Sequence, residues 1–503
     1  MKALKGLLKY IGIVLASIVA LALILLCIMY FFPSVRIFGV GVVHYNKQLT
    51  PSSVVLSEYS NYSSIELNVN SKKINIDIIP SDGENIECGL KLNIFGISTE
   101  IVEYTVVKNV AVEDRVLKIY LNVSEPSGWI ATSNSRVTVN IPVGYEYSLL
   151  TNSKSGDVSI GNTSQTINVS NLFVSTGSGN LNLVNMGESL ELDSLNLSTD
   201  KGYFDLSSIT NINVDNKVKL VANDGRFKFN NLNASLDVTG TGVKIEANNI
   251  ICDEDGFTVI ANNGYFDISK LYSPTGAENT IITENTSLNI GEITGKTGIV
   301  TEYGDISINT LNDYTMIENT NGRVAVETAK DTILVQTVMG DISVDEYLKS
   351  GKFESERGNI NVNSTSNYVD GYVTEIINVD GNVTINNKIN LLLITTTGRS
   401  KVDVEFEIIK DDFVDLTKVF QHTIKASKAG SCLVTIPTDK SPHFKFMARG
   451  DISGEITGFS ASDYSNVHSS DQYQYYPSAD DQDLCLNSCS FWFEGKIQFR
   501  GNA

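Results

Sequence analysis

Short blocks of alternating apolar and polar residues recur at a fixed interval in the second half of the chain. Gly304, Gly322, Gly340 and Gly358 follow one another at an 18-residue interval, and Thr286 holds the position one step before them. An aliphatic residue stands two and four positions after each of these starts, which is the period of a strand with one apolar face. The two columns are Leu288, Ile306, Val324, Ile342 and Ile360, and Ile290, Ile308, Val326, Val344 and Val362.

Each of these repeats also predicts a second strand. Thirteen positions after the start comes another apolar column, Ile299, Ile317, Val335 and Phe353. Two positions later stands a small polar column, Thr301, Asn319, Thr337 and Ser355. Each repeat therefore holds two short strands.

An earlier block has a longer, 23-residue period, marked by Gly156, Gly179, Gly202 and Gly225. Its first strand carries the column Val158, Leu181, Phe204 and Phe227, and its second strand carries Val174, Leu197 and Leu220. The extra length falls between the two strands. The turn from the second strand back to the glycine keeps the same length in both blocks, so one corner is tight and the other is permissive.

Repeats of about this length with apolar columns predict a solenoid, in which neighbouring rungs stack to bury their apolar faces. An antiparallel meander or sandwich is the alternative, but it gives no reason for one corner to keep a constant length. We therefore expect an all-β fold with a β-solenoid over residues 151–390. The repeated glycine suits a corner that needs positive φ or close backbone approach.

The flanking segments are strand-like without the period. Residues 56–150 are expected to form an N-terminal β cap, because an open terminal rung would expose unpaired backbone. Residues 391–503 are expected to form a C-terminal β domain. Within it, residues 460–483 are rich in Tyr, Ser and Asp and predict an exposed polar loop.

Residues 10–32 contain no charged side chain. At about 1.5 Å per residue this segment spans a hydrocarbon core of roughly 30 Å, which predicts a transmembrane helix. Lys2, Lys5 and Lys9 precede it, so residues 1–9 are expected in the cytoplasm, 33–55 as a juxtamembrane linker, and the bulk of the chain outside the cell. A cleaved signal peptide is the alternative, but a further apolar run follows its small-residue site at Ala20 and Ala22.

Charge and motifs narrow the function classes. The chain has 38 basic and 58 acidic residues and a net charge of −20, which excludes a nucleic-acid partner. It lacks the glycine-rich phosphate loops and the nucleophile elbow of common enzymes. The histidines are scattered and the cysteines outside the apolar segment are odd in number, so we expect no cofactor, no metal and no disulfide framework. The histidines are His44, His422, His443 and His468.

A glycan-cleaving β-helix is the main enzyme alternative, since it needs only two or three carboxylates. Asp253, Glu254 and Asp255 are the densest acidic group of the predicted solenoid, but Gly256 beside them indicates an ordinary turn. Asp157, Asp305 and Asp341 could line one edge and hold Ca²⁺. Arg or Asn occupies the same position in other rungs, which breaks that series.

The run from Val137 to Ile160 contains a strand, a turn at Pro142 and the unit Ser155-Gly156-Asp157-Val158. It resembles the bacterial putative-adhesin family of β-strand-repeat domains, and Gly304-Asp305-Ile306, Gly340-Asp341-Ile342 and Gly358-Asn359-Ile360 fit the family's further repeats. The resemblance covers about residues 60–390. It implies a β-repeat fold and membrane anchorage, and it carries over no catalytic residues.

The candidate binding residues are Tyr473, Tyr475 and Tyr476, an exposed aromatic cluster of the kind that contacts sugars or proteins. A loop that packs these tyrosines on its own domain explains them equally well. The sequence thus predicts a single-pass, non-catalytic surface protein that binds an extracellular glycan or protein ligand, with self-association open. The alternatives are the glycan-active enzyme and a structural or sensory envelope protein.

Overall fold

The computed structural model describes residues 2–31, 41–98, 106–123, 129–132, 135–365, 372–387, 391–398 and 400–406, with further strand segments between 420 and 502. Strands hold 66% of the residues and helix 7%, which confirms the all-β prediction. The chain divides into two compact units, residues 1–230 and 231–503.

The single long helix among the described residues is α1 (Lys2–Phe31). Its segment Ile11–Phe31 has a mean hydropathy of 3.1 and is long and apolar enough to cross a membrane. The helix thus coincides with the predicted membrane span, because an unbroken apolar run without Pro or Gly punctuation after Gly12 favours continuous helix.

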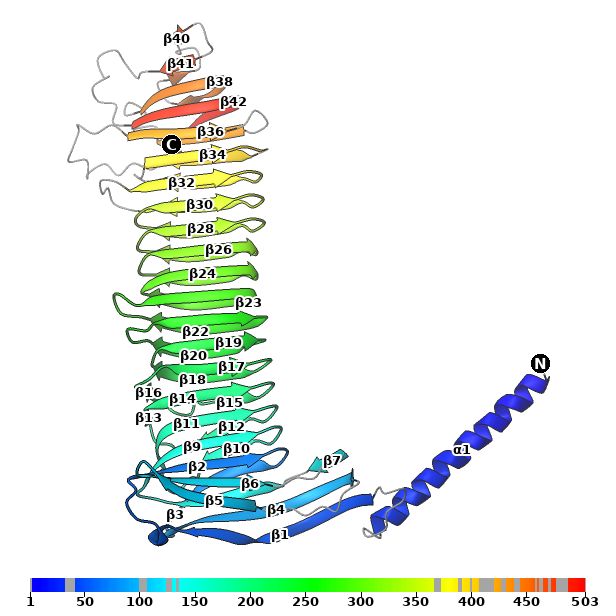
Figure 1. Cartoon of the computed structure of the whole chain (residues 1–503). Coiled ribbons are helices and arrows are strands. Elements are labelled where there is room, and N and C mark those ends of the chain that lie inside the picture. Colours follow the sequence, from blue (N-terminus) through cyan, green and yellow to red (C-terminus); the bar gives the residue numbers. More distant parts are fainter. Residues whose placement is uncertain are drawn as a thin grey trace. The chain divides into compact units, whose positions relative to one another are not determined.

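Two ladders of strands run through the first unit (Figure 1). The first ladder is, in spatial order, β5 (Val106–Glu113), β6 (Val116–Val123), β2 (Ser64–Ser71), β9 (Glu146–Ser153), β11 (Asn168–Thr176), β14 (Ser194–Thr199) and β17 (Val218–Ala222). The second is β1 (Gly41–Val55), β4 (Asn85–Ser98), β8 (Arg136–Pro142), β3 (Asn75–Ser81), β10 (Val158–Gly161), β12 (Leu181–Val184), β15 (Tyr203–Asp205) and β18 (Arg226–Asn233).

Pairing in the repeat region of this unit is parallel, and each residue pairs with its equivalent one 23-residue repeat later. Val158 pairs with Leu181, Leu181 with Phe204, and Phe204 with Phe227. The register confirms the solenoid and rules out an antiparallel meander for the described repeats. The longer rungs carry an additional short strand in the permissive corner, β13 (Ser189–Leu192) paired with β16 (Asn211–Val214).

Antiparallel strands close the N-terminal end of both ladders. β5 lies antiparallel on β6, and β4 pairs antiparallel with β8, with β1 and with β7 (Trp129–Thr132). The segment predicted as a cap also supplies rungs, because β2 lies between β6 and β9. Spatial order and chain order therefore differ at this end.

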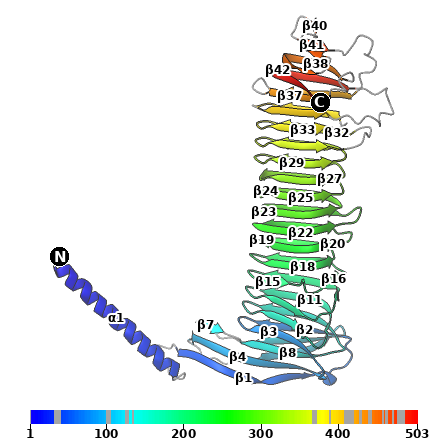
Figure 2. The same ribbon diagram turned by 180° about the vertical axis from the view of Figure 1, so that it is seen from behind.

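The second unit has the same construction (Figure 2). Over residues 278–362 its pairing offset is the shorter, 18-residue repeat, and on either side of this stretch most offsets are longer. Its first ladder is β19 (Leu236–Thr241), β21 (Phe257–Asn262), β23 (Glu278–Thr294), β24 (Lys296–Tyr303), β26 (Thr315–Asn321), β28 (Ile333–Thr337), β30 (Gly351–Ser355), β32 (Val373–Asn378), β34 (Leu391–Thr396) and β36 (Phe420–Ala426). The second ladder is β20 (Lys244–Ile251), β22 (Gly264–Tyr272), the later half of β23, β25 (Ile306–Leu311), β27 (Val324–Ala329), β29 (Ile342–Tyr347), β31 (Ile360–Ser364), β33 (Val383–Asn387), β35 (Lys401–Phe406) and β37 (Ser431–Pro437).

Parallel pairing continues past residue 390. The assignment of residues 391–503 to a C-terminal β domain stays a prediction. β42 (Asn487–Asn502) pairs with β36, β37 and β38 (Phe444–Ile456). The remaining short strands are β39 (Phe459–Ser460), β40 (Ser465–His468) and β41 (Gln472–Tyr475), the last two within the predicted polar loop.

The core consists of the inward columns predicted from the repeats. Phe204 and Phe227 are fully buried and meet edge to face with ring centroids 5.6 Å apart. The small polar column is buried too, and it holds the tight corner. The Thr176 hydroxyl donates to the Gly179 carbonyl at 2.7 Å. A Cβ on Gly179 would overlap the carbonyl oxygen of Gly156, so the corner requires glycine there.

Candidate functional site

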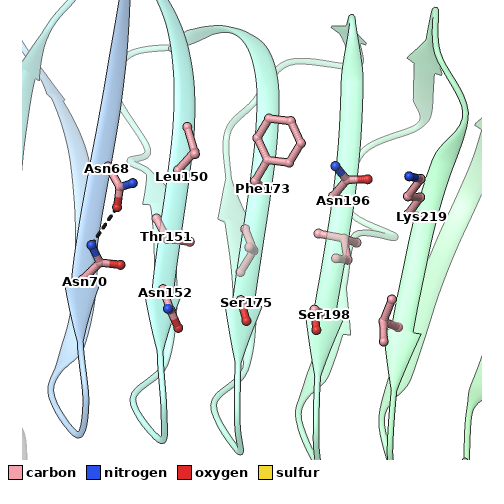
Figure 3. Close-up of a pocket in the computed structure, with 13 residues that line it drawn as sticks. Asn68, Asn70, Leu150, Thr151, Asn152, Phe173, Ser175, Asn196, Ser198 and Lys219 are labelled. Carbon is pink, nitrogen blue, oxygen red and sulfur yellow. Dashed lines mark hydrogen bonds between the residues drawn. The ribbon is translucent and has the colours of Figure 1, made fainter. Parts of the chain in front are cut away.

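A groove of about 430 Å³ lies on the outer face of the first unit, across strands β2, β9, β11, β14 and β17 (Figure 3). β2, β9, β11 and β14 are each paired on both sides for most of their length, so the floor of the groove is continuous sheet. A floor of this kind is rigid, because its backbone hydrogen-bonding groups are used within the ladder.

The strand period and the register place the groove side chains in two rows that cross the strands. Side chains two residues apart on a strand share a face, and paired residues stand side by side on neighbouring strands. The first row is Asn68, Leu150, Phe173, Asn196 and Lys219. The second row is Asn70, Asn152, Ser175, Ser198 and Val221.

Polar groups at one end of the groove hydrogen-bond to each other. The Asn70 amide donates to Asn68 Oδ1 and to Asn122 Oδ1, both at 2.8 Å. The other polar side chains of the two rows make no hydrogen bond within the described part of the chain; these are Asn152, Ser175, Asn196 and Ser198. Outside the groove on the same face, by contrast, the Asn171 amide donates to the Ser148 hydroxyl at 3.0 Å.

The groove carries little charge and much apolar surface. Lys219 is the one ionisable residue among the lining residues, and no carboxylate is among them. Leu150 and Phe173 are neighbours in the first row and are half-buried although they point outward. Val221 is 44% exposed in the second row. This arrangement can bind a ligand, but it lacks the acid and base that bond cleavage requires.

The sequence-predicted binding residues are not among the residues that line the groove. Tyr473 and Tyr475 belong to β41, and their side chains lie outside the described residues, as does Tyr476 altogether. The assignment of these tyrosines therefore stays a prediction. The groove was missed at the sequence level, although a signal was present: Leu150 and Phe173 are apolar at outward positions where the earlier repeat block is mostly polar.

The acidic candidates serve as turn and ladder acceptors. Asp253 accepts from the Ser235 hydroxyl and, at 3.0 Å, from the Asp255 N–H, as expected of an ordinary turn. The Asp305 carboxylate accepts from the Arg323 N–H at 2.9 Å. No group of three or more His, Cys, Asp or Glu side chains that could hold a metal occurs in the described part of the chain.

Two cysteines are buried in the described part of the chain, Cys88 and Cys252. Burial raises the pKa of the Cys88 thiol to about 11, so this thiol is unreactive at neutral pH. The side chains of the four histidines lie outside the described residues.

A protein-family model matches part of the chain. Residues 63–273 match the family model described as Toastrack DUF4097, a domain of unknown function, over less than half of the chain. Over those residues the match confirms the predicted resemblance to a putative-adhesin β-strand-repeat family. The match ends at residue 273, whereas the resemblance was expected to reach about residue 390.

Solved structures with some similarity bear related names. A putative cell adhesion protein from Clostridium sporogenes ATCC 15579 shares 10% identity, with 91% of this chain and 100% of that chain covered and a TM-score of 0.16. A putative adhesin from Parabacteroides merdae ATCC 43184 shares 14% identity, with 61% and 96% covered and a TM-score of 0.22. No curated protein matches this chain.

Proposed function

We propose that this chain, in which residues 63–273 form a Toastrack DUF4097 domain, is a membrane-anchored, non-catalytic binding module at the cell surface. The helix α1 anchors it, and the lysines at positions 2, 5 and 9 keep the short N-terminus in the cytoplasm. The two β-solenoid units are then displayed outside the cell.

The observation that carries the proposal is the groove across β2, β9, β11, β14 and β17. It combines outward apolar side chains with amides and hydroxyls that no neighbour in the described chain satisfies. Apolar side chains beside a few hydrogen-bonding groups that are open to solvent are the usual composition of a ligand site. The lack of a carboxylate in the lining favours binding without bond chemistry.

The binding role is tested with cells that display the full-length chain. Adhesion to immobilised cell-wall polymers, matrix proteins and glycans is compared between the natural chain and Phe173→Asp, which places a charge in the apolar part of the groove. We expect saturable adhesion to at least one surface, reduced about tenfold or more by the substitution. Ile260→Asp, at a 55% exposed outward position of the second unit, is the matched control and should adhere normally.

Two results would contradict the proposal. Equal adhesion by Phe173→Asp and the natural chain would remove the groove from the function. Cleavage of a glycan during the assay would favour the enzyme alternative.

Protease digestion of intact cells tests the topology, because an N-terminal tag should survive while the solenoid units are degraded.

A further inference from the structure

We propose that the groove of the first unit binds a neutral, linear glycan whose chain axis crosses the strands from β2 to β17. This inference rests on the proposed binding function and names its ligand class. Three observations support it: the low charge of the groove, the side-chain donors and acceptors that make no hydrogen bond within the described chain, and the arrangement of the two rows.

Charge excludes strongly ionic ligands. The lining has one cation, Lys219 at the β17 end, and no anion, so a polycationic ligand would find no partner there. The chain as a whole has a net charge of −20, which repels polyanions. A ligand without net charge fits both facts.

Hydrogen-bonding chemistry then favours sugars over peptides. A peptide binds a sheet most readily by pairing with an edge strand, yet β9, β11 and β14 are each paired on both sides. Only side chains are offered here. A carboxamide such as that of Asn196 presents a donor and an acceptor together, and hydroxyls such as Ser175 and Ser198 do both. Sugar hydroxyls need partners of this dual kind.

The apolar side chains supply a platform for the sugar rings. Phe173 stands between Leu150 and Asn196 in the first row, as Figure 3 shows. Aromatic rings pack against the C–H faces of sugars while the ring edges stay polar. The second row, with Asn152, Ser175 and Ser198 on successive strands, runs beside this platform as a line of hydrogen-bonding groups.

The two rows also orient the ligand. They run perpendicular to the strands, so both repeat at the strand spacing of about 4.8 Å. The hydroxyls of an extended glycan lie along the edges of its rings, beside the C–H faces. A chain laid across the strands therefore runs along both rows over their whole length, whereas a chain laid along one strand would cross each row only once.

Binding of neutral hexasaccharides to the full-length chain in nanodiscs tests the inference. Cellohexaose, xylohexaose, maltohexaose and chitohexaose are the probes, and an oligogalacturonate and a neutral hexapeptide are the comparison ligands. We expect at least one neutral hexasaccharide to bind, with Kd raised about tenfold or more by Phe173→Ala and about threefold to tenfold by Asn196→Ala. Phe173→Tyr should retain binding, since it keeps the ring.

Asn182→Ala is the matched control, because Asn182 lies on β12 of the other ladder, is exposed and is outside the groove. It should leave Kd unchanged within about twofold. Circular dichroism of each variant establishes that the β fold is intact before binding is compared.

The outcomes separate this inference from the proposed function. Adhesion that depends on Phe173, together with no binding of any neutral hexasaccharide, overturns the glycan assignment and leaves the binding role standing. Preference for the oligogalacturonate or the peptide overturns it as well. Hexasaccharide binding that neither groove variant weakens overturns the site. Absence of both cell adhesion and hexasaccharide binding overturns both proposals.

Discussion

The Asp157 carboxylate accepts a 2.8 Å hydrogen bond from the backbone N–H of Asn180, the residue at the same corner one rung later. Asn75 accepts in the same way from the Asp157 N–H at 3.0 Å, and Asn180 accepts from the Tyr203 N–H at 2.9 Å. Where Asp or Asn holds this corner position, its side chain thus links one rung to the next. Asp and Asn can both do so because each supplies Oδ1 as an acceptor.

Loss of this oxygen should loosen the next rung. Asp157→Ala is expected to increase the hydrogen-exchange rate of the Asn180 amide about fivefold, because it removes a hydrogen bond worth ~1 kcal/mol. Asp157→Asn should leave that exchange rate unchanged. Hydrogen exchange of the peptide containing Asn180 measures the effect. Asp215→Ala, at an exposed position, serves as the control; equal exchange in all variants would show that the ladder adds no stability.

Glycine should be required at the corner and dispensable in mid-strand. A Cβ on Gly340 would overlap the carbonyl oxygen of Gly322, whereas a Cβ on Gly298 in β24 meets no atom within 4 Å. Gly340→Ala should therefore lower the free energy of unfolding by about 1–3 kcal/mol or more, and Gly298→Ala should leave it unchanged or raise it by up to about 1 kcal/mol. Urea midpoints of the two variants provide the comparison, and similar midpoints would refute the steric argument.

Two buried hydroxyls of β9 should respond in opposite directions. Thr151 Oγ1 has no hydrogen-bond partner in the described chain, although the residue is 3% exposed. Ser153 Oγ, in contrast, accepts from the Gly156 N–H at 2.8 Å. Thr151→Val should raise the free energy of unfolding by about 1 kcal/mol, and Ser153→Ala should lower it by about 1–3 kcal/mol. Destabilisation by Thr151→Val would indicate that its hydroxyl is satisfied by ordered water.

Stability should fall at alkaline pH because of two buried tyrosines. Burial raises the pKa of Tyr147 and of Tyr347 well above the ordinary value of about 10. A raised folded-state pKa contributes stability that is complete below the unfolded pKa and is lost as the pH rises from about 10 toward the folded value. The urea midpoint should thus hold from about pH 8 to about 9.5 and drop above about pH 10.

The tyrosine origin of that drop is tested by substitution. Tyr147→Phe removes a 2.8 Å hydrogen bond to the Pro142 carbonyl and so lowers stability at neutral pH. The double variant Tyr147→Phe, Tyr347→Phe should nevertheless lose less stability than the natural chain between about pH 9 and about pH 11. An unchanged pH dependence would assign the alkaline loss to other groups.

The repeats allow much of the fold to be predicted from the sequence. In a parallel solenoid the residue one period later is the spatial neighbour, so the apolar columns of the two repeat blocks are themselves the register. Val158 with Leu181 and Ile306 with Val324 pair as their spacing predicts. The candidate membrane span in α1 can also be predicted from the sequence, because it is recognised by length and apolar composition alone.

Without a period, only the tertiary structure decides which strands are neighbours. β2 lies between β6 and β9, an order that no local pattern encodes because it depends on how the chain folds back over its own end. The groove has the same origin. Phe173 becomes part of a site because parallel pairing places it between Leu150 and Asn196. The polar side chains around it face outward and remain available to a ligand. Inward positions must be apolar because they are buried, and this requirement appears in the sequence as a period. The outward surface is instead formed by neighbouring strands that are distant in the chain, so no local pattern predicts it.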